Sequence, residues 1–126
     1  MLGVAFRGFQ NRHASLILRS GVLSPGDEIF FLSGKVTDNP TQTSVWDKAR
    51  QVHVEDPLVK FMNHSCTPNT IIHDSRVTAL QIIEAGEDLT FNYLQNEPEI
   101  TSGFTCDTCG GMILGRLYPP SCCIHP

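Results

Sequence analysis

The sequence predicts a mostly β protein built from short strands, with very little helix. Apolar runs rich in Val, Ile, Leu and Phe are short, and turn-forming Pro, Gly, Asn and Asp separate them at close intervals. Only one point in the chain carries the signals that begin a helix. With 126 residues, 40% of them hydrophobic, the chain is long enough for one globular domain with a modest core.

Turn signals divide the chain into strands. Ser24-Pro25-Gly26-Asp27 separates two apolar runs, and a loop around Asp38-Asn39-Pro40 follows the second of them. Asp74-Ser75 predicts the turn of a hairpin, and Ala85-Gly86-Glu87 leads into the last strand. In chain order, the expected strands are Ser15–Arg19, Glu28–Leu32, Gln42–Trp46, Gln51–Val54, Thr70–His73, Arg76–Ile83 and Leu89–Asn92.

The one helix signal is Asp56-Pro57. Asp is a favoured N-cap residue, and Pro suits the first helical position because its missing N–H would be unpaired there. A short helical segment from Leu58 to Met62 would then lead into Asn63-His64-Ser65-Cys66.

The charge balance excludes some function classes. A net charge of −4 disfavours binding to nucleic acid through phosphate contacts. No stretch approaches the roughly 18 apolar residues that a membrane span needs. We therefore expect no direct nucleic-acid partner and no membrane segment. A mildly acidic surface would suit a basic peptide, or would simply keep the protein soluble.

The first 26 residues allow two interpretations. They contain Arg7, Arg12 and Arg19 and no acidic residue, which resembles the composition of a transit peptide. The alternative, which we favour, is that they already form the first strands, since Leu16-Ile17-Leu18 leads directly into a turn and another strand. We expect an intracellular protein, cytoplasmic or nuclear.

The cysteines suggest a metal site. Without a secretory signal, a disulfide framework is disfavoured relative to zinc ligation or free thiols. Cys106 and Cys109 form a C-x-x-C followed by two glycines, a spacing typical of a zinc knuckle. Because a structural zinc has four ligands, Cys66 would supply the third and Cys122 or Cys123 the fourth. Reduced cysteines packed in a tail are the alternative.

Two longer motifs carry a family resemblance. Phe61 to Asn69 reads FMNHSCTPN and Ile83 to Tyr93 reads IEAGEDLTFNY. Together with the segment that begins at Phe104, they resemble SET-domain protein lysine methyltransferases, including the cysteine-rich post-SET tail. The resemblance runs from about residue 15 to about residue 115, in the family's order. It implies a SET-domain core at 1–103, with a knot-like crossing of the two motifs, and a post-SET-like tail with a zinc knuckle at 104–126.

The resemblance also implies a mechanism and roles for individual residues. Asn63 and His64 would contact S-adenosylmethionine, and Cys66 would donate its thiolate to the structural zinc. Tyr93 would lie where the methyl sulfonium meets the lysine amine of a protein substrate, with histones as the best-known substrate class. Phe91 would line the lysine channel and act as a size gate for successive methylations.

Two departures from the family pattern keep rival functions open. Ala14 and Leu16 occupy the positions of the family's Gly-x-Gly, where the backbone approaches the cofactor. No cysteine stands near Ile113 or Leu114, where the family's third post-SET cysteine would fall. A non-catalytic SET module that binds a basic peptide or partner protein is therefore the first alternative. A thiol hydrolase that pairs Cys66 with His64 is the second. The particular substrate, the oligomeric state and the compartment are not predicted.

Overall fold

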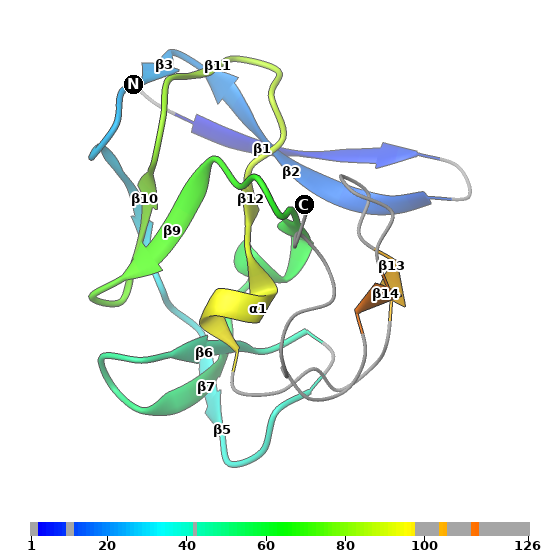
Figure 1. Ribbon diagram of the computed structural model, residues 1–126, viewed down its shortest axis with the longest axis vertical. Helices are drawn as coiled ribbons and strands as arrows, with labels where there is room; N and C mark the ends of the chain where they lie inside the picture. The colour runs from blue at the N-terminus through cyan, green and yellow to red at the C-terminus, as the bar shows by residue number, and fades with distance from the viewer. Residues whose placement is uncertain (1–2, 10–11, 42, 98–103, 106–111, 114–126) are drawn as a thin grey trace, which may run out of the picture.

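The fold is mostly β, as the sequence predicts (Figure 1). The computed structural model describes residues 3–9, 12–41, 43–97, 104–105 and 112–113. Short strands form several small sheets around one hydrophobic core, and almost no helix is present among these residues. The strands are β1 (Gly3–Phe9), β2 (Arg12–Ser20), β3 (Val22–Leu23), β4 (Glu28–Phe31), β5 (Lys35–Thr37), β6 (Val45–Asp47), β7 (Val52–Glu55), β8 (Asn63–His64), β9 (Thr70–His73), β10 (Arg76–Ala79), β11 (Ile83–Glu84), β12 (Thr90–Phe91), β13 (Phe104–Thr105) and β14 (Met112–Ile113). The helical segments are the 3₁₀ turn η1 (Val59–Phe61) and the single-turn helix α1 (Tyr93–Asn96). No helix of the described ranges is long and apolar enough to cross a membrane.

Two sheets of three strands frame the molecule. One has the order β4-β10-β9 and the other β5-β7-β6, and all their pairs are antiparallel. The remaining pairs are β1-β2, β11-β3, β12-β8 and β13-β14. The β1-β2 hairpin extends to one side of the body (Figure 1). Residues 3–9 and 12–20 are thus strands, which confirms the interpretation of the N-terminal segment as strands.

The turn predictions are confirmed at two places. In the first turn Asp27 N–H donates to the Ser24 carbonyl (3.0 Å), and Gly26 has a φ of 91°, a left-handed angle that glycine adopts without strain. Between β9 and β10, Asp74 and Ser75 have φ angles of 53° and 62°, which are the left-handed angles of a tight hairpin turn. Leu32 N–H donates to the Ser75 carbonyl (2.8 Å) and ties this turn to the end of β4.

Two expected strands have different limits. The strand expected at Gln42–Trp46 begins only at Val45, with residue 42 outside the described ranges. Before it, Thr41 N–H donates to the Ser44 hydroxyl (2.8 Å) and Ser44 N–H to the Thr41 hydroxyl (3.0 Å), and such local bonds compete with a strand ladder. The run expected at Arg76–Ile83 divides into β10 and β11, because Leu80 N–H leaves the ladder and donates to the Asn69 carbonyl (2.8 Å).

Asp56 caps the 3₁₀ turn as expected, although η1 is shorter than the helix predicted at Leu58–Met62. One carboxylate oxygen accepts the N–H groups of Leu58 and Val59, both at 2.8 Å. The other accepts Ser33 N–H at 2.7 Å, and so joins the turn to the loop after β4. Asp56 is almost completely buried, and these three bonds satisfy its carboxylate.

The helix α1 is absent from the sequence prediction, which extended a strand to Asn92. The ladder ends at Phe91, and the Asn92 carbonyl accepts the N–H groups of Gln95 (3.1 Å) and Asn96 (3.2 Å). A single turn is unstable by itself, so its contacts with the rest of the fold have to stabilise it.

The hydrophobic core joins the sheets beneath the two motifs. Its members are Leu16, Leu18, Leu23, Leu32, Val45, Val54, Val59, Met62, Ile72, Val77, Ala79, Ile83, Leu89 and Phe91. Tyr93 and Phe61 pack against it from the motif segments. The core therefore supports the backbone of both motifs from one side.

Candidate active site

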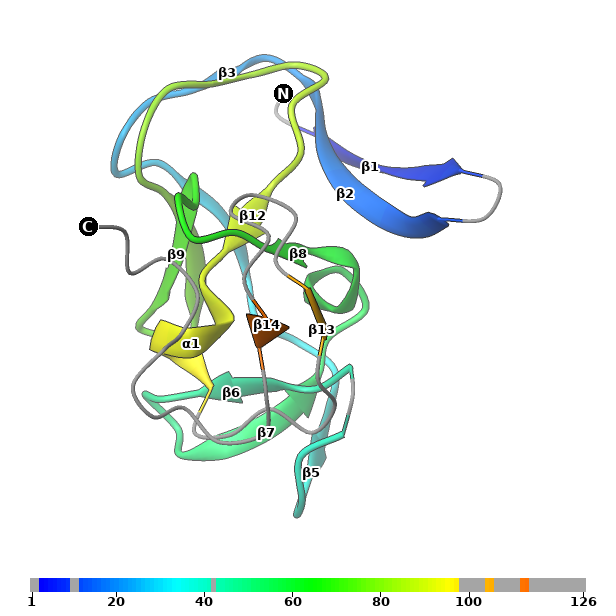
Figure 2. The same ribbon diagram turned by 45° about the vertical axis from the view of Figure 1, so that its right-hand side comes forward.

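The two motif segments lie side by side. Strands β8 and β12 form a parallel pair, with Asn63 opposite Thr90 and His64 opposite Phe91. Ser65 N–H extends the pairing by donating to the Phe91 carbonyl (3.1 Å). The two strands run next to each other through the middle of the molecule (Figure 2). A parallel pair needs a long crossover connection, and here the residues between His64 and Thr90, which include β9, β10 and β11, provide it.

Asn69, the last residue of the first motif, fastens that motif to the second. Its Nδ2 donates to the Asp88 carbonyl (2.7 Å), and its Oδ1 accepts Thr90 N–H (2.9 Å). Thr70 adds a bond from its hydroxyl to the Thr90 carbonyl (2.7 Å). Asn69 and Thr70 are both buried, so these bonds are shielded from water.

Tyr93 is held by the first motif at two points. Its N–H donates to His64 Nδ1 (3.0 Å), and its hydroxyl donates to the Met62 carbonyl. The Tyr93 ring meets the His64 ring edge-on at 5.3 Å and lies 4.6 Å from the Phe91 ring. Since Nδ1 accepts a bond, the proton of the neutral His64 ring lies on Nε2. The tyrosine is therefore fixed by backbone and side chain before any substrate arrives.

The hydroxyl of Tyr93 is a hydrogen-bond donor and not a base. Burial, together with the negative charge of Glu97, raises the pKa of Tyr93 far above its ordinary value. The hydroxyl therefore stays protonated at neutral pH.

His64 and Phe91 are almost completely buried beside Tyr93, and Asn63 is half-buried at the start of the same parallel pair. Cys66 is a half-buried free thiol two residues after His64. The Tyr93 N–H occupies His64 Nδ1, so this nitrogen is not available to activate Cys66 as a nucleophile.

Leu16 and Ala14 lie in β2. Leu16 has a relative exposure of 0% and belongs to the hydrophobic core, while its carbonyl accepts Leu89 N–H (2.8 Å). The bulk that replaces the family's glycine is thus accommodated by the core, directly beside the second motif. Ala14 is in the same strand, and its side chain lies outside the described part of the structure.

The expected zinc ligands are not brought together in the described part of the structure. Cys106, Cys109 and Cys122 all lie outside it. Within residues 3–9, 12–41, 43–97, 104–105 and 112–113, no cluster of three or more His, Cys, Asp or Glu side chains could hold a metal ion. The zinc site stays a prediction.

Two residues near Tyr93 were missed by the sequence analysis. Asn96, the last residue of α1, and Glu97, which follows it, contact the backbone of Trp46 in β6. No local pattern indicates this, because the bonded residues are about fifty positions apart.

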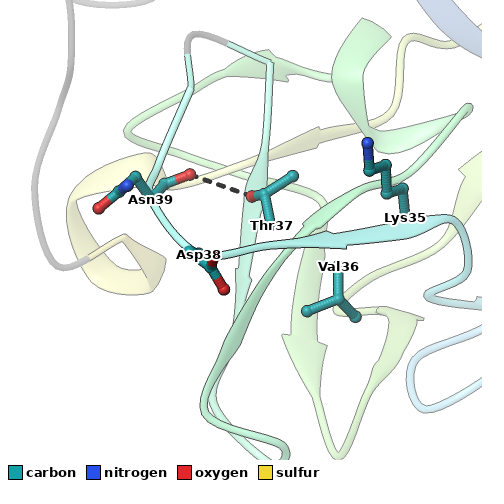
Figure 3. Close-up of a pocket in the computed structure, with 5 residues that line it drawn as sticks. All are labelled: Lys35, Val36, Thr37, Asp38 and Asn39. Carbon is teal, nitrogen blue, oxygen red and sulfur yellow. Dashed lines mark hydrogen bonds between the residues drawn. The ribbon is translucent and has the colours of Figure 1, made fainter.

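Two hollows border the described structure. A hollow of about 390 Å³ lies along β5 and the loop after it, lined by Lys35, Val36, Thr37, Asp38 and Asn39 (Figure 3). None of these residues belongs to the motifs, so we assign it no catalytic role. A smaller hollow of about 130 Å³ lies between β9 and α1, and Phe91 and Asn92 form part of its wall.

The family can now be named. The SET domain model matches residues 11–94, which is more than half of the 126 residues, and the chain belongs to the SET domain family. A similar curated protein is the histone-lysine N-methyltransferase ASHR3 of Arabidopsis thaliana, with 32% identity over 75 residues, 52% of this chain and 15% of that protein.

Solved structures show the same fold. KRYPTONITE, in complex with mCHH DNA, an H3(1-15) peptide and SAH, has a TM-score of 0.57 at 16% identity. The match covers 74% of this chain and 23% of that one. The Chaetomium thermophilum polycomb repressive complex 2, autoinhibited and bound to S-adenosylmethionine, has a TM-score of 0.52 at 18% identity. Here the match covers 90% of this chain and 19% of that one. This chain therefore spans less than a quarter of each of these relatives.

Proposed function

We propose that the protein is an S-adenosylmethionine-dependent protein lysine methyltransferase. The observation that carries the proposal is the position of Tyr93, whose N–H and hydroxyl are both bonded to the first motif, over a parallel pair that joins the two motifs. A fixed hydroxyl suits a methyl-transfer site, because the main task of such a site is to hold the amine nitrogen in line with the methyl group.

The relatives support the substrate class. ASHR3 is named a histone-lysine N-methyltransferase, and the two structural neighbours hold S-adenosylmethionine or SAH, one of them together with a histone H3 peptide. We carry these properties over as a proposal: the substrate is an accessible lysine in a protein or peptide, with histone H3 as the first candidate. A nuclear or cytoplasmic location would agree with that substrate.

The residues present fit the cofactor. Asn63 and His64 form the strand that pairs with the second motif, and the half-buried amide of Asn63 offers both a donor and an acceptor for polar groups of the cofactor. The Leu16 side chain is inside the hydrophobic core, so it does not project into the solvent, from which the cofactor would enter. When bound, S-adenosylmethionine supplies an activated methyl group on a sulfonium.

The chain's own residues then position the amine. Because the Tyr93 hydroxyl donates to Met62, its oxygen can accept an N–H of the lysine and turn the nitrogen lone pair toward the methyl carbon. The amine has to be neutral to attack, although the ordinary pKa of lysine is about 10.4. The apolar wall formed by Phe91 disfavours the charged form. With the cofactor bound, the oriented amine would accept the methyl group, and the resulting methylated ammonium would release its proton to solvent.

The zinc site is part of the proposal. Cys66 follows the cofactor residues of the first motif, and we propose that it binds zinc with Cys106, Cys109 and Cys122. Metal analysis should then find about one zinc per chain. Cys66→Ser and Cys106→Ser should each lower the zinc content. A metal-free protein with full activity would contradict the zinc site and leave the catalytic proposal intact.

Radiolabelled S-adenosylmethionine tests the main proposal. The protein should label histone H3 or a protein in a panel of histones and cell extracts. Saturating cofactor should also raise the melting temperature, since a ligand that binds the native state stabilises it. Asn63→Ala should remove most of this rise, whereas Asn39→Ala, at an exposed asparagine, serves as the matched control. Tyr93→Phe should keep the rise and lose turnover.

The rival functions make different predictions in the same experiment. A non-catalytic SET module would bind a basic peptide and label no protein. A melting curve unmoved by saturating cofactor would reject the enzyme in favour of that module. A thiol hydrolase would require Cys66 for activity and be indifferent to the cofactor.

A further inference from the structure

Two side chains at the end of α1 grip the backbone of one residue in β6. Both carboxylate oxygens of Glu97 accept the Trp46 N–H, at 3.1 and 3.0 Å. Asn96 Nδ2 donates to the Trp46 carbonyl (3.0 Å) and to Glu97 Oε2 (2.5 Å). We call Asn96 and Glu97 together the Trp46 clamp. The clamp satisfies the N–H and the C=O of the same residue.

The clamp takes the place of a missing neighbour strand. β6 is at the edge of the sheet β5-β7-β6, so the backbone groups on its outer side have no ladder partner. Trp46 lies opposite His53 in β7, and its backbone groups point away from His53 toward the clamp. Residues opposite each other without mutual hydrogen bonds bring their side chains close, and the Trp46 and His53 rings are indeed 4.7 Å apart.

The clamp belongs to the same helical turn as Tyr93. Glu97 N–H donates to the Tyr93 carbonyl at 2.8 Å, and α1 begins at Tyr93 and ends at Asn96. The first motif holds the other side of Tyr93 through His64 and Met62. Figure 2 shows α1 between the parallel pair and β6. The α1 turn is therefore bonded to the first motif through Tyr93 and to β6 through the clamp.

A charged carboxylate at this partly buried place loses part of its hydration, which disfavours the charged form. Glu97 is partly buried, and this burial raises its pKa, although the Trp46 and Asn96 hydrogen bonds and the positive charge of Lys48 oppose the rise. Lys48 itself donates to the Gln95 carbonyl (2.7 Å) on the same helical turn. Only the ionised carboxylate can accept from Trp46 and from Asn96 without presenting a proton to either of them.

We propose that Asn96 and Glu97 are positioning residues for methyl transfer, which set the place of the Tyr93 hydroxyl by anchoring α1 to the Trp46 backbone. This inference rests on the proposed function. Without the clamp, the helical turn loses its bonds to Trp46 and is joined to this end of β6 through the exposed Lys48 side chain, so Tyr93 can shift relative to the amine and the methyl carbon. A shift of about 1 Å can lower the rate roughly 100-fold even when the substituted residue is distant from the reacting atoms.

The expected result is a split between turnover and binding. Asn96→Ala and Glu97→Ala should each lower kcat about 10- to 100-fold. The KM and the Kd for S-adenosylmethionine should stay within about twofold, because the parallel pairing with Thr90 and Phe91 holds Asn63 and His64 without the clamp. Glu97→Gln keeps one carbonyl acceptor for the Trp46 N–H and should have an intermediate kcat. Activity is expressed per folded protein, measured below the melting temperature of each variant.

A structural control removes a side-chain bond to the residue next to Trp46 in β6, a bond that does not involve α1. Ser75 donates its hydroxyl to the buried Asp47 carboxylate at 2.8 and 2.9 Å, in the turn between β9 and β10. Ser75→Ala should lower the melting temperature and leave kcat unchanged. Where Glu97→Ala melts below the assay temperature, Glu97→Gln and Asn96→Ala decide the result.

Trp46 provides a readout that does not need the substrate. It is the only tryptophan of the chain, so the fluorescence reports on the surroundings of its ring, which lies against His53 on the residue that the clamp holds. Opening the clamp should change the emission of Asn96→Ala and Glu97→Ala relative to wild type, and by more than in Ser75→Ala, which loses a bond to the neighbouring Asp47. An unchanged emission in all the clamp variants would overturn the inference, because the clamp would then not hold Trp46.

The failure of this inference differs from the failure of the proposed function. If the wild-type protein transfers no methyl group, the proposed function fails and the positioning role falls with it. If the wild type is active and the clamp variants behave like Ser75→Ala, with a lower melting temperature and an unchanged kcat, only the positioning role is overturned. A raised KM for the cofactor with unchanged kcat would also overturn it.

Discussion

Replacing Asn69 by alanine removes the pair of side-chain hydrogen bonds that fastens the first motif to the second. The side chain donates to the Asp88 carbonyl (2.7 Å) and accepts the Thr90 N–H (2.9 Å). Asn69 has a relative exposure of only 7%, whereas its partner Asp88 is exposed and Thr90 is half-buried, so the two bonds lie at the border of the core. Alanine is small enough to fit, and the substitution therefore acts on the hydrogen bonds and not through a steric clash.

The cost follows from the hydrogen bonds that two backbone groups lose, the Asp88 carbonyl and the Thr90 N–H. Because Asp88 is exposed and Thr90 is half-buried, each lost bond costs about its net contribution of 0.5–1.5 kcal/mol and not the full penalty of a buried unpaired group. The two bonds together give a loss of roughly 1–3 kcal/mol in the free energy of unfolding. For a domain of this size, 1 kcal/mol corresponds to about 4 °C, so the melting temperature should fall by roughly 4–12 °C.

Urea denaturation measures the loss. Asn69→Ala should lower the midpoint without changing the slope, because the area exposed on unfolding stays the same. Asn39→Ala, at an exposed asparagine, is the control and should change the stability by less than about 0.5 kcal/mol. Hydrogen exchange should show lost protection at the Thr90 amide in particular. A loss below about 1 kcal/mol, or equal losses in both variants, would refute the assignment of Asn69 as the fastening between the motifs.

Three further predictions concern other parts of the fold. Gly34→Ala should prevent stable folding, measured by circular dichroism, because Gly34 has a φ of 110° and an added Cβ would lie 2.1 Å from the Glu55 carbonyl oxygen; a native melting curve would contradict this close approach. Burial alone would raise the pKa of Asp47, but its hydrogen bonds, first that from Arg50, hold the pKa of this carboxyl group below the usual value. The carboxylate therefore stabilises the fold above about pH 4, and this stabilisation is lost as the pH falls through the lowered pKa. Thermal melts of wild type and Asp47→Asn should therefore differ at pH 7 and converge in acid, and a constant difference would count against the role of the charge. Wild type should produce di- or trimethyl-lysine and Phe91→Tyr mainly monomethyl-lysine by mass spectrometry, because a tyrosine hydroxyl can hold a water in the space that a methylated amine needs; strictly monomethyl product from the wild type would exclude the gate.

Much of the local structure could be predicted from the sequence. The turns at Ser24–Asp27 and Asp74-Ser75, the cap at Asp56 and the mostly β class depend on a few neighbouring residues, whose backbone preferences are local. The resemblance of the motifs to the SET family also identified the family itself, which the match to residues 11–94 confirms. The roles assigned to Asn63, Tyr93 and the cysteine tail remain predictions.

The tertiary structure decided how the site is assembled. The parallel pairing of Asn63–His64 with Thr90–Phe91, the burial of Leu16 in the core and the contact of Glu97 with Trp46 all join segments that are far apart in the chain. The α1 turn was missed because four residues cannot form a stable helix by their own preferences, and bonds to other elements stabilise it. Hydrogen-bond partners separated by 29 or 51 residues leave no periodic pattern in the sequence, because only the folded chain brings their atoms within 3 Å or so of each other.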